Sequence, residues 1–525
     1  MPNSTRTRAL RLTTAAFFLA FLLVGLVVFK DYGISWDEIP TREFGLMNVQ
    51  HTVPDAHTLD SLRAANGPAY ERFGPFFEIL LVRAEQLLPA SDPRVTFLQR
   101  HLLTFLTFFL GVVLFHALCR RRFGGWIALL ASLCVVLSPQ LFAHSFYNVK
   151  DISFLTVFVG SMLTLDIFLE RPSVRTMFVH GVVGAIAMGT RVLGLFAMML
   201  TGAAAIVNRP TRRTLALLVG YGVVVAVLLP VVWPVLRIDA IGIVKDAVLG
   251  ATTNPYTKTN LFRGQEVLAS ALPWDYVPTW ILVTTPYLVI ALFLVGTLRF
   301  LVRFAYAPRS VVEGAMLRDA IVGAWFFLPV MGCVILKPIM YDGWRHLFFV
   351  YPALVYIAAI GMEGIRELAI RRSGAVRHHR TVDGVLSAAF LAALAPIVVF
   401  MVTNHPLEHL YFNRLAGRDM AEVKQRYELD YWGLSYRPAL EYILRTDSSA
   451  SIGIKVANYP GRANALILPP RDRARLRYVK SEAEADYFIT NYRFHPGPYP
   501  FPNEVFTVRV GNASVASVFH LTPAR

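Results

Sequence analysis

The stretch LTTAAFFLAFLLVGLVVF, residues 12–29, decides the fold, because threonine is the only polar residue type over its 18 positions. A helix rises about 1.5 Å per residue, so this run can cross most of the ~30 Å hydrocarbon core of a membrane. It is longer than the apolar region of a cleavable signal peptide, and no small-residue cleavage site follows it. We therefore interpret it as an uncleaved membrane anchor.

The rest of the chain has the same character, since 55% of its 525 residues are hydrophobic and only 16% are charged. A soluble core could not bury that much apolar surface. Ten further runs are candidate spans: residues 97–118, 125–143, 152–169, 177–189, 192–207, 215–233, 280–300, 320–336, 347–365 and 385–402. Two of them, on either side of Arg191, are short, so they form a tight hairpin or one of them fails to span. We expect a polytopic α-helical membrane protein with about 11 transmembrane helices.

The formal net charge of +16 is concentrated in alternate connections. Arginine-rich segments fall at residues 6–11, 120–122, 171–175, 209–213, 299–318 and 366–380. Basic residues in short loops stay on the cytoplasmic side, which predicts an N-terminus inside and the intervening loops outside. This topology and anionic inner-leaflet lipid explain the basic charge, so membrane lipid is an expected partner and nucleic acid is not.

Residues 404–525 differ from the membrane module at residues 1–403, because they hold no membrane-length run and more charge. Helical spacing at Tyr436–Leu444 and several short strands predict a small α/β domain. The strands are expected at residues 451–456, 465–468, 475–479, 486–490, 505–510 and 514–520. An odd number of spans makes this C-terminal domain soluble and extracytoplasmic.

Acids and cations recur in the outward loops. Asp37 and Glu38 follow Trp36 just after the first span, where an interfacial cap is the alternative interpretation. Asp151 opens another span beside Lys150, and a helix N-terminus also favours an acid by its dipole alone. The loop KPIMYDGWRH, residues 337–346, adds cations and one acid. For Arg191, snorkelling to the headgroups is the alternative.

These clusters converge on one side of one membrane. Cations there can bind an anionic lipid phosphate, while a carboxylate can take a proton from an acceptor hydroxyl. Group transfer from a lipid-linked donor is the function that uses both. A transporter or flippase of lipid-linked sugars is the alternative, although its acids would be expected nearer the midplane. A non-catalytic assembly factor would leave the clusters as caps.

Several short motifs resemble those of the GT-C glycosyltransferases, and within them the bacterial relatives of protein O-mannosyltransferases and of lipid A aminoarabinose transferase. The motifs are WDE at 36–38, YNVKD at 147–151, GTR at 189–191, the segment 337–352, LPWDYVPTW at 272–280, HPLEHLYFN at 405–413 and YELDYWG at 427–433. The resemblance runs through nearly the whole chain. It implies a membrane glycosyltransferase that takes a hexosyl or pentosyl group from a polyprenyl-phosphate donor and inverts the anomeric centre.

The resemblance also implies roles at matching positions. Asp37 corresponds to the catalytic base, Glu38 to the second acid of an Asp-Glu pair and Asp151 to the acid of the second outer loop. The candidates for binding the donor phosphate are Lys150, Arg191, Arg345, His346 and Lys337. Further loop candidates are Tyr341, Asp342, Lys258 and Arg263. The expected location is the outer face of the cytoplasmic (inner) membrane, where the product joins the cell envelope.

The sequence leaves the sugar open, and the acceptor could be a protein, a lipid or a polysaccharide. It also leaves the cofactor open. Asp37, Glu38 and Asp151 offer the hard oxygen ligands that Mg²⁺ or Mn²⁺ prefers, while Arg and Lys alone can handle a monophosphate leaving group. A divalent metal therefore stays an alternative.

Overall fold

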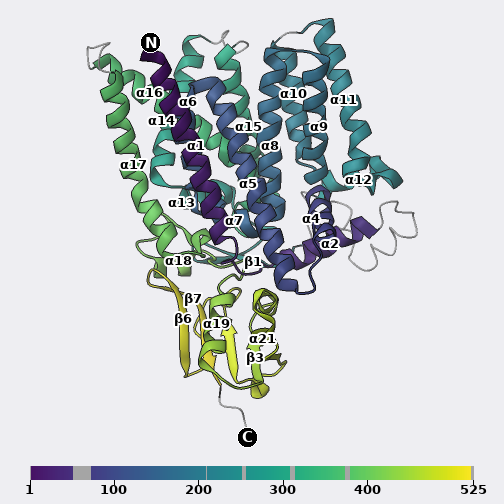
Figure 1. Cartoon of the computed structure of the whole chain (residues 1–525), viewed down its shortest axis with the longest axis vertical. Coiled ribbons are helices and arrows are strands. Elements are labelled where there is room, and N and C mark those ends of the chain that lie inside the picture. Colours follow the sequence, from purple (N-terminus) through teal and green to yellow (C-terminus); the bar gives the residue numbers. More distant parts are fainter. Residues whose placement is uncertain are drawn as a thin grey trace.

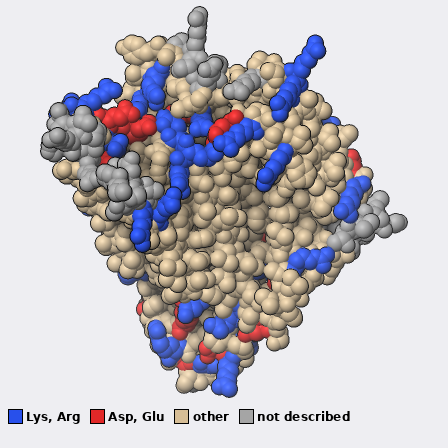
Figure 2. All heavy atoms as spheres, turned by 45° about the horizontal axis from the view of Figure 1, so that its top comes forward, with Lys and Arg blue, Asp and Glu red and all other residues tan. Residues whose placement is uncertain are grey.

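The structure is a computed structural model that describes residues 2–50, 73–208, 210–250, 256–307, 314–372 and 379–521. A bundle of long helices carries the N-terminus at one end and a small sheet domain beyond the other end (Figure 1). Lys and Arg gather at the N-terminal end and again on the C-terminal domain, with a largely uncharged belt between them (Figure 2). Parts of the predicted basic connections, at 209, 308–313 and 373–378, lie outside the described residues.

The bundle is built from helices of very different length. In chain order they are α1 (Pro2–Val28), α2 (Glu38–Gln50), α4 (Phe76–Leu87), α5 (Pro93–Phe123), α6 (Gly125–Val136), α7 (Pro139–Tyr147), α8 (Val149–Glu170), α9 (Val174–Thr190), α10 (Gly194–Asn208), α11 (Arg212–Val232), α12 (Leu236–Gly250), α13 (Tyr276–Thr284), α14 (Tyr287–Tyr306), α15 (Gly314–Leu336), the 3₁₀ helix η3 (Arg345–Val350), α16 (Tyr351–Arg372) and α17 (His379–Thr403). A hairpin of β1 (Thr259–Phe262) and β2 (Gln265–Leu268) precedes α13.

Eight helices in the described ranges are long and apolar enough to cross a membrane, and they match eight of the eleven predicted spans. The polytopic helical fold is therefore confirmed. The other three predicted spans do not form single helices of membrane-spanning length. Residues 125–143 form α6 and α7, bent by 65° at a break before Pro139, where proline cannot continue the preceding helix. Helices α9 and α10, which flank Arg191, are shorter apolar helices. Within the described ranges the count is eight, or nine with the bent pair as one span.

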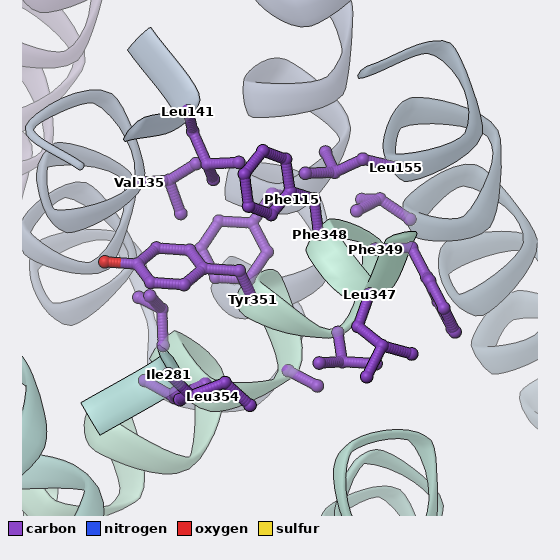
Figure 3. Packing of buried hydrophobic residues seen from close by; sticks show 14 of the residues in the cluster. Phe115, Val135, Leu141, Leu155, Ile281, Leu347, Phe348, Phe349, Tyr351 and Leu354 are labelled. Carbon is purple, nitrogen blue, oxygen red and sulfur yellow. The ribbon is translucent and has the colours of Figure 1, made fainter. Parts of the chain in front are cut away.

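Two of the spans form the centre of the bundle. In α8 and in the combined span Arg345–Arg372, 83% of the apolar 18-residue stretch is buried. Large side chains from η3 and the start of α16 pack against those of α5, α6, α7 and α8 (Figure 3). This packing fixes the backbone immediately after Arg345. The labelled residues include Leu347, Phe348, Phe349, Tyr351 and Leu354 on one side and Phe115, Val135, Leu141 and Leu155 on the other.

The C-terminal domain is a five-stranded mixed sheet in the order β4-β3-β5-β7-β6. Its strands are β3 (Ile452–Val456), β4 (Leu476–Tyr478), β5 (Tyr487–Thr490), β6 (Glu504–Val510) and β7 (Ala513–His520). Strand β3 pairs in parallel with β4 and β5, while β7 runs antiparallel to β5 and β6. Helix α19 (Tyr436–Thr446) packs its apolar face on this sheet. The predicted α/β fold is confirmed.

Short helices fill the connections of this region: η5 (Glu408–Leu410), α18 (Met420–Arg426), α20 (Pro460–Ala463), η6 (Asn464–Ile467), α21 (Pro470–Arg473) and η7 (Glu482–Glu484). The predicted strand at 465–468 is wrong, because η6 occupies it. The buried Asn464 starts η6 and binds across to the bundle: its Oδ1 accepts from the Ile34 N–H at 3.0 Å, and its Nδ2 donates to the Ile34 carbonyl at 2.9 Å. This tertiary contact outweighs the local strand pattern.

The main hydrophobic cluster extends past the predicted boundary at residue 404. It includes residues between Leu407 and Leu434 as well as the bundle, whereas a separate cluster lies between α19 and the sheet. The segment after α17 thus joins the two parts, and the boundary between residues 403 and 404 stays a prediction.

Candidate active site

Three predicted acids from three chain segments meet at the guanidinium of Arg345. Its Nη1 lies 3.4 Å from Asp37 Oδ2 and 3.4 Å from Asp151 Oδ2, and its Nη2 lies 3.3 Å from Asp342 Oδ2. Only 3% of the Arg345 side chain is exposed, so the cation is held inside the protein by these acids. The convergence expected from the outward loops is therefore present in the structure.

Local backbone geometry places two of the acids. The side chain of Asn148 caps α8 by accepting from the Asp151 N–H at 3.2 Å, and its amide donates to Asp151 Oδ2 at 2.7 Å. Asp342 has a φ of 57° and Gly343 a φ of 70°, a turn in which Asp is tolerated and Gly is favoured. A Cβ at Gly343 would also lie 3.3 Å from the Trp280 ring. This turn lets Asp342 and Arg345 contact each other.

Further predicted cations surround Asp151. Arg191 follows α9, and its Nη2 lies 2.5 Å from Asp151 Oδ1 while its Nη1 donates to the His346 carbonyl at 3.4 Å. Asp151 therefore lies between two guanidinium groups. His346 presents a buried Nδ1 with no hydrogen-bond partner among the described residues. Lys150 neighbours Asp151 in sequence, and its Nζ lies 4.6 Å from the centre of the Phe73 ring.

Asp37 and Glu38 point to different surroundings. The Asp37 side chain is 37% exposed and lies against Arg345. Glu38 is buried: its Oε2 accepts from the Ser35 N–H at 2.6 Å, and its Oε1 lies 2.8 Å from His101 Nε2. Asp37 is thus the acid that an acceptor can reach, and Glu38 holds the loop that carries it.

Of the remaining loop candidates, Tyr341 contacts this cluster, while the other three have their described contacts elsewhere. The Tyr341 ring centre lies 5.2 Å from the Arg345 guanidinium carbon. Lys258 contacts the C-terminal domain, with Nζ 5.9 Å from the Phe494 ring centre. Arg263 forms an ion pair of 2.7 Å with Asp275, and Lys337 is exposed at the end of α15.

Two residues at the site, Arg493 and Glu428, were not among the predicted site residues, although Glu428 lies in the YELDYWG motif at 427–433. Arg493, from the C-terminal domain, places Nη2 2.7 Å from Asp342 Oδ1 and lies over the Trp36 ring at 4.6 Å. Arg493 Nε lies 3.8 Å from Glu428 Oε1. Burial raises the pKa of Glu428 to about 7. The available signal was the position of Arg493 just after the parallel strand β5, because ligand sites of open α/β sheets form at the carboxyl ends of strands.

The acids do not form a ligand set for a metal. Glu38 is held by His101 and a backbone N–H, and Asp151 by Arg191, Arg345 and Asn148. No group of three or more His, Cys, Asp or Glu residues suited to a metal occurs in the ranges that the structure describes. These contacts add no support for a divalent metal, which stays a prediction.

Residues 95–238 match the family model of dolichyl-phosphate-mannose-protein mannosyltransferases. Over this range the chain is similar to that family. The match confirms the predicted resemblance there and covers Lys150, Asp151 and Arg191, whereas Asp37 and residues 337–346 lie outside it. No curated protein matches the sequence.

Solved GT-C structures are similar over most of the chain at low identity. ArnT from Cupriavidus metallidurans bound to undecaprenyl phosphate is 14% identical, with a TM-score of 0.48 and 97% of both chains covered. The Archaeoglobus fulgidus oligosaccharyltransferase AglB, in complex with an inhibitory peptide and a dolichol-phosphate, is 11% identical with a TM-score of 0.44 over 91% of this chain and 70% of that one. The mycobacterial arabinofuranosyltransferase AftD is 12% identical with a TM-score of 0.41, over 96% and 40%.

Proposed function

We propose that this protein transfers a sugar from a polyprenyl-phosphate donor to an acceptor at the outer face of the cytoplasmic membrane. The observation that carries the proposal is a half-exposed carboxylate, Asp37, held beside the buried guanidinium of Arg345 at 3.4 Å. A base and a phosphate-binding cation are the two groups that this transfer needs at one place. The family match supports a polyprenyl-type phosphate donor.

Asp37 acts as the general base. Its carboxylate takes the proton of the acceptor hydroxyl while the hydroxyl oxygen attacks the anomeric carbon of the donor. The bond between that carbon and the phosphate oxygen breaks, and its electron pair leaves with the lipid phosphate. One displacement through an oxocarbenium-like transition state inverts the anomeric configuration.

The cations stabilise the leaving phosphate. Arg345 and Arg191 are both held by Asp151, at 3.4 Å and 2.5 Å, so their guanidinium groups are positioned before the donor binds. Fixed donors of this kind stabilise developing negative charge without reorganising during the reaction. Lys150, the residue before Asp151, adds a positive charge. The Nδ1 of His346, which has no partner among the described residues, offers a further polar contact.

The topology agrees with an outer-face reaction. The site lies at the end of the bundle away from the N-terminus, next to the C-terminal domain (Figure 1). With the basic N-terminal end inside, Asp37 and this domain face the extracytoplasmic side. The acceptor approaches from that side, and the polyprenyl chain lies in the membrane.

Asp37→Asn tests the proposal, and Asp31→Asn is its matched control because the Asp31 side chain is 39% exposed and pairs with His405 instead of Arg345. Purified protein in lipid nanodiscs is assayed with a panel of radiolabelled polyprenyl-phosphate sugars and cell-envelope extracts as acceptor. Asp37→Asn should lose about 10³-fold in transfer rate, within the usual range for a lost general base, and Asp31→Asn should stay close to wild type. Equal transfer by Asp37→Asn and wild type would disprove the assigned base. Absence of transfer by wild type from every donor would disprove the function.

A further inference from the structure

A cleft lies next to the candidate active site, between the β1–β2 hairpin and the C-terminal domain. It is open to solvent. The hairpin, the segment 424–430, the segment 491–496 and the start of β7 all contribute to its walls. The cleft exists only because parts of the chain that are distant in sequence meet here.

Two cleft residues connect it to the site. Arg493 lines the cleft and lies 2.7 Å from Asp342, which in turn contacts Arg345. Phe494 lines the cleft, and its ring centre lies 6.3 Å from that of Trp36, the residue before Asp37. None of Lys150, Arg191 and Arg345 is part of the lining. The cleft therefore adjoins the proposed base without including the cations proposed for the lipid phosphate.

The lining has no dominant sign of charge. Two acids, Glu266 and Glu428, and two basic residues, Lys424 and Arg493, line it, whereas the buried carboxylate of Asp430 is bound by His409 and Ser435. A polyanionic or polycationic ligand would meet like charges here, and charged side chains are a poor lining for an acyl chain. An uncharged polar ligand is the class that fits this balance.

Glu428 and Arg493 leave hydrogen-bonding capacity unused. The Glu428 side chain is 12% exposed, and its contact with Arg493 Nε is long, at 3.8 Å. Arg493 Nε is buried without a hydrogen-bond partner among the described residues. A hydroxyl group can donate to the carboxylate and accept from the guanidinium, so it satisfies both.

Aromatic rings complete the lining. Tyr427, Tyr492 and Phe494 contribute to the walls. Rings can stack on the C–H face of a sugar, while charged side chains such as Glu428 and Arg493 bind its hydroxyls. A ligand with both kinds of surface is a saccharide.

We propose that this cleft binds the acceptor, and that the portion bound there is an uncharged, hydroxyl-rich saccharide. The inference deepens the proposed function, and the role of the bound saccharide as acceptor rests on that function. It places the acceptor on the side of Asp37 that the C-terminal domain covers. Hydrogen bonds to Glu428 and Arg493 hold the saccharide, and the reacting hydroxyl extends past Trp36 toward Asp37.

Saccharide binding is measured on the full chain in nanodiscs by saturation-transfer NMR. The probes are uncharged trisaccharides of mannose, galactose, glucose and arabinose, a trigalacturonate as acidic probe and a Ser/Thr-containing peptide. At least one uncharged trisaccharide should bind, and more tightly than the acidic probe or the peptide. At pH 8, above the pKa of about 7 that burial gives Glu428, Glu428→Gln should weaken binding about tenfold, as expected for losing hydrogen bonds to a charged group.

Ser514→Phe is the second variant, because Ser514 lines the cleft and a ring there fills it. Ser451→Phe, at an exposed position of the same domain, is the matched control and should bind as wild type does. Asp37→Asn should also bind the trisaccharide normally, because the binding readout does not need transfer.

Three results would overturn the inference: no uncharged trisaccharide binds, the acidic probe or the peptide binds in preference, or Ser514→Phe binds as tightly as Ser451→Phe. These outcomes leave the Asp37→Asn transfer result untouched. Retained transfer in Asp37→Asn would instead contradict the proposed base while the cleft still binds saccharide.

Discussion

The bundle carries an arginine-carboxylate cluster at each end, and the two differ in how the central arginine is paired. At the N-terminal end, Arg122 Nε and Nη2 each bind an Asp319 oxygen at 2.9 Å, and its Nη1 lies 3.1 Å from Glu363. At the other end, Arg345 contacts Asp37, Asp151 and Asp342 at 3.3 to 3.4 Å. We call these the clamp cluster (Arg122, Asp319, Glu363, Arg299 and Glu367) and the site cluster (Arg345, Asp37, Asp151, Asp342 and Arg191).

The difference separates a structural role from a functional one. A bidentate pair at 2.9 Å uses the fork of the guanidinium fully and leaves little capacity for a ligand. The longer contacts of Arg345 restrain the cation without saturating it, and its Nε is buried without a partner among the described residues. An unused donor alone does not identify a site, because Arg299 Nε in the clamp cluster also has no hydrogen-bond partner among the described residues. The site cluster is set apart by three acids from separate segments around one guanidinium that is only 3% exposed, with Asp37 among them partly exposed.

The largest effect is expected from Arg345→Lys. Lysine keeps the charge but loses the planar fork that spans three acids, so transfer should fall by about 10³-fold, as when a fixed donor to a developing anion is removed. The transfer rate per folded molecule is the measurement. Arg299→Lys in the clamp cluster should change this rate little, and an equal loss in both variants would contradict the assignment.

The next effect is on stability, at the opposite end. Asp319→Asn leaves the buried Arg122 without its bidentate partner, which should lower the free energy of unfolding by about 3 kcal/mol. Thermal unfolding in detergent with a fluorescence readout measures this change. Transfer per folded molecule should stay near the wild-type rate, and loss of transfer without loss of stability would show that the clamp cluster has a role in the reaction.

The smallest effect concerns Glu428, which joins the site cluster through Arg493. Because burial raises its pKa to about 7, folded protein keeps this proton between about pH 4.5 and 7 while unfolded chains release it. Glu428 therefore makes stability fall as pH rises through that window. Glu428→Gln should remove this fall, so that it gains about 2 kcal/mol relative to wild type between pH 5 and pH 8. The melting temperatures of the two proteins are measured from pH 5 to pH 8. A constant difference between them across this range would contradict the prediction.

The sequence predicted the parts that depend on local pattern and on topology. Apolar runs located the spans, and the alternation of basic loops placed Asp37, Asp151 and Arg345 on the same side of the membrane. Because the ends of packed helices on one side lie close together, residues so placed could meet. Their contacts with Arg345 follow from that arrangement.

Long-range contacts account for what the sequence could not predict. Arg493 and Asp342 are 151 residues apart, and no local period links them. The separation of Asp37 from Glu38 depends on His101 in α5, and the loss of the strand at 465–468 depends on Asn464 binding Ile34. In each case a partner from another segment decides the outcome.

Lipid phosphate binding tests the central claim most directly. Undecaprenyl phosphate is titrated into nanodiscs that hold wild type, Arg345→Gln or Arg299→Gln, and native mass spectrometry or fluorescence follows binding. Each variant removes one arginine, the first from the site cluster and the second from the clamp cluster. We expect the affinity to fall at least about tenfold in Arg345→Gln, because a charge-assisted bond to phosphate is lost, and to stay unchanged in Arg299→Gln. Equal affinity in Arg345→Gln and wild type would contradict the claim that the site cluster holds the donor phosphate.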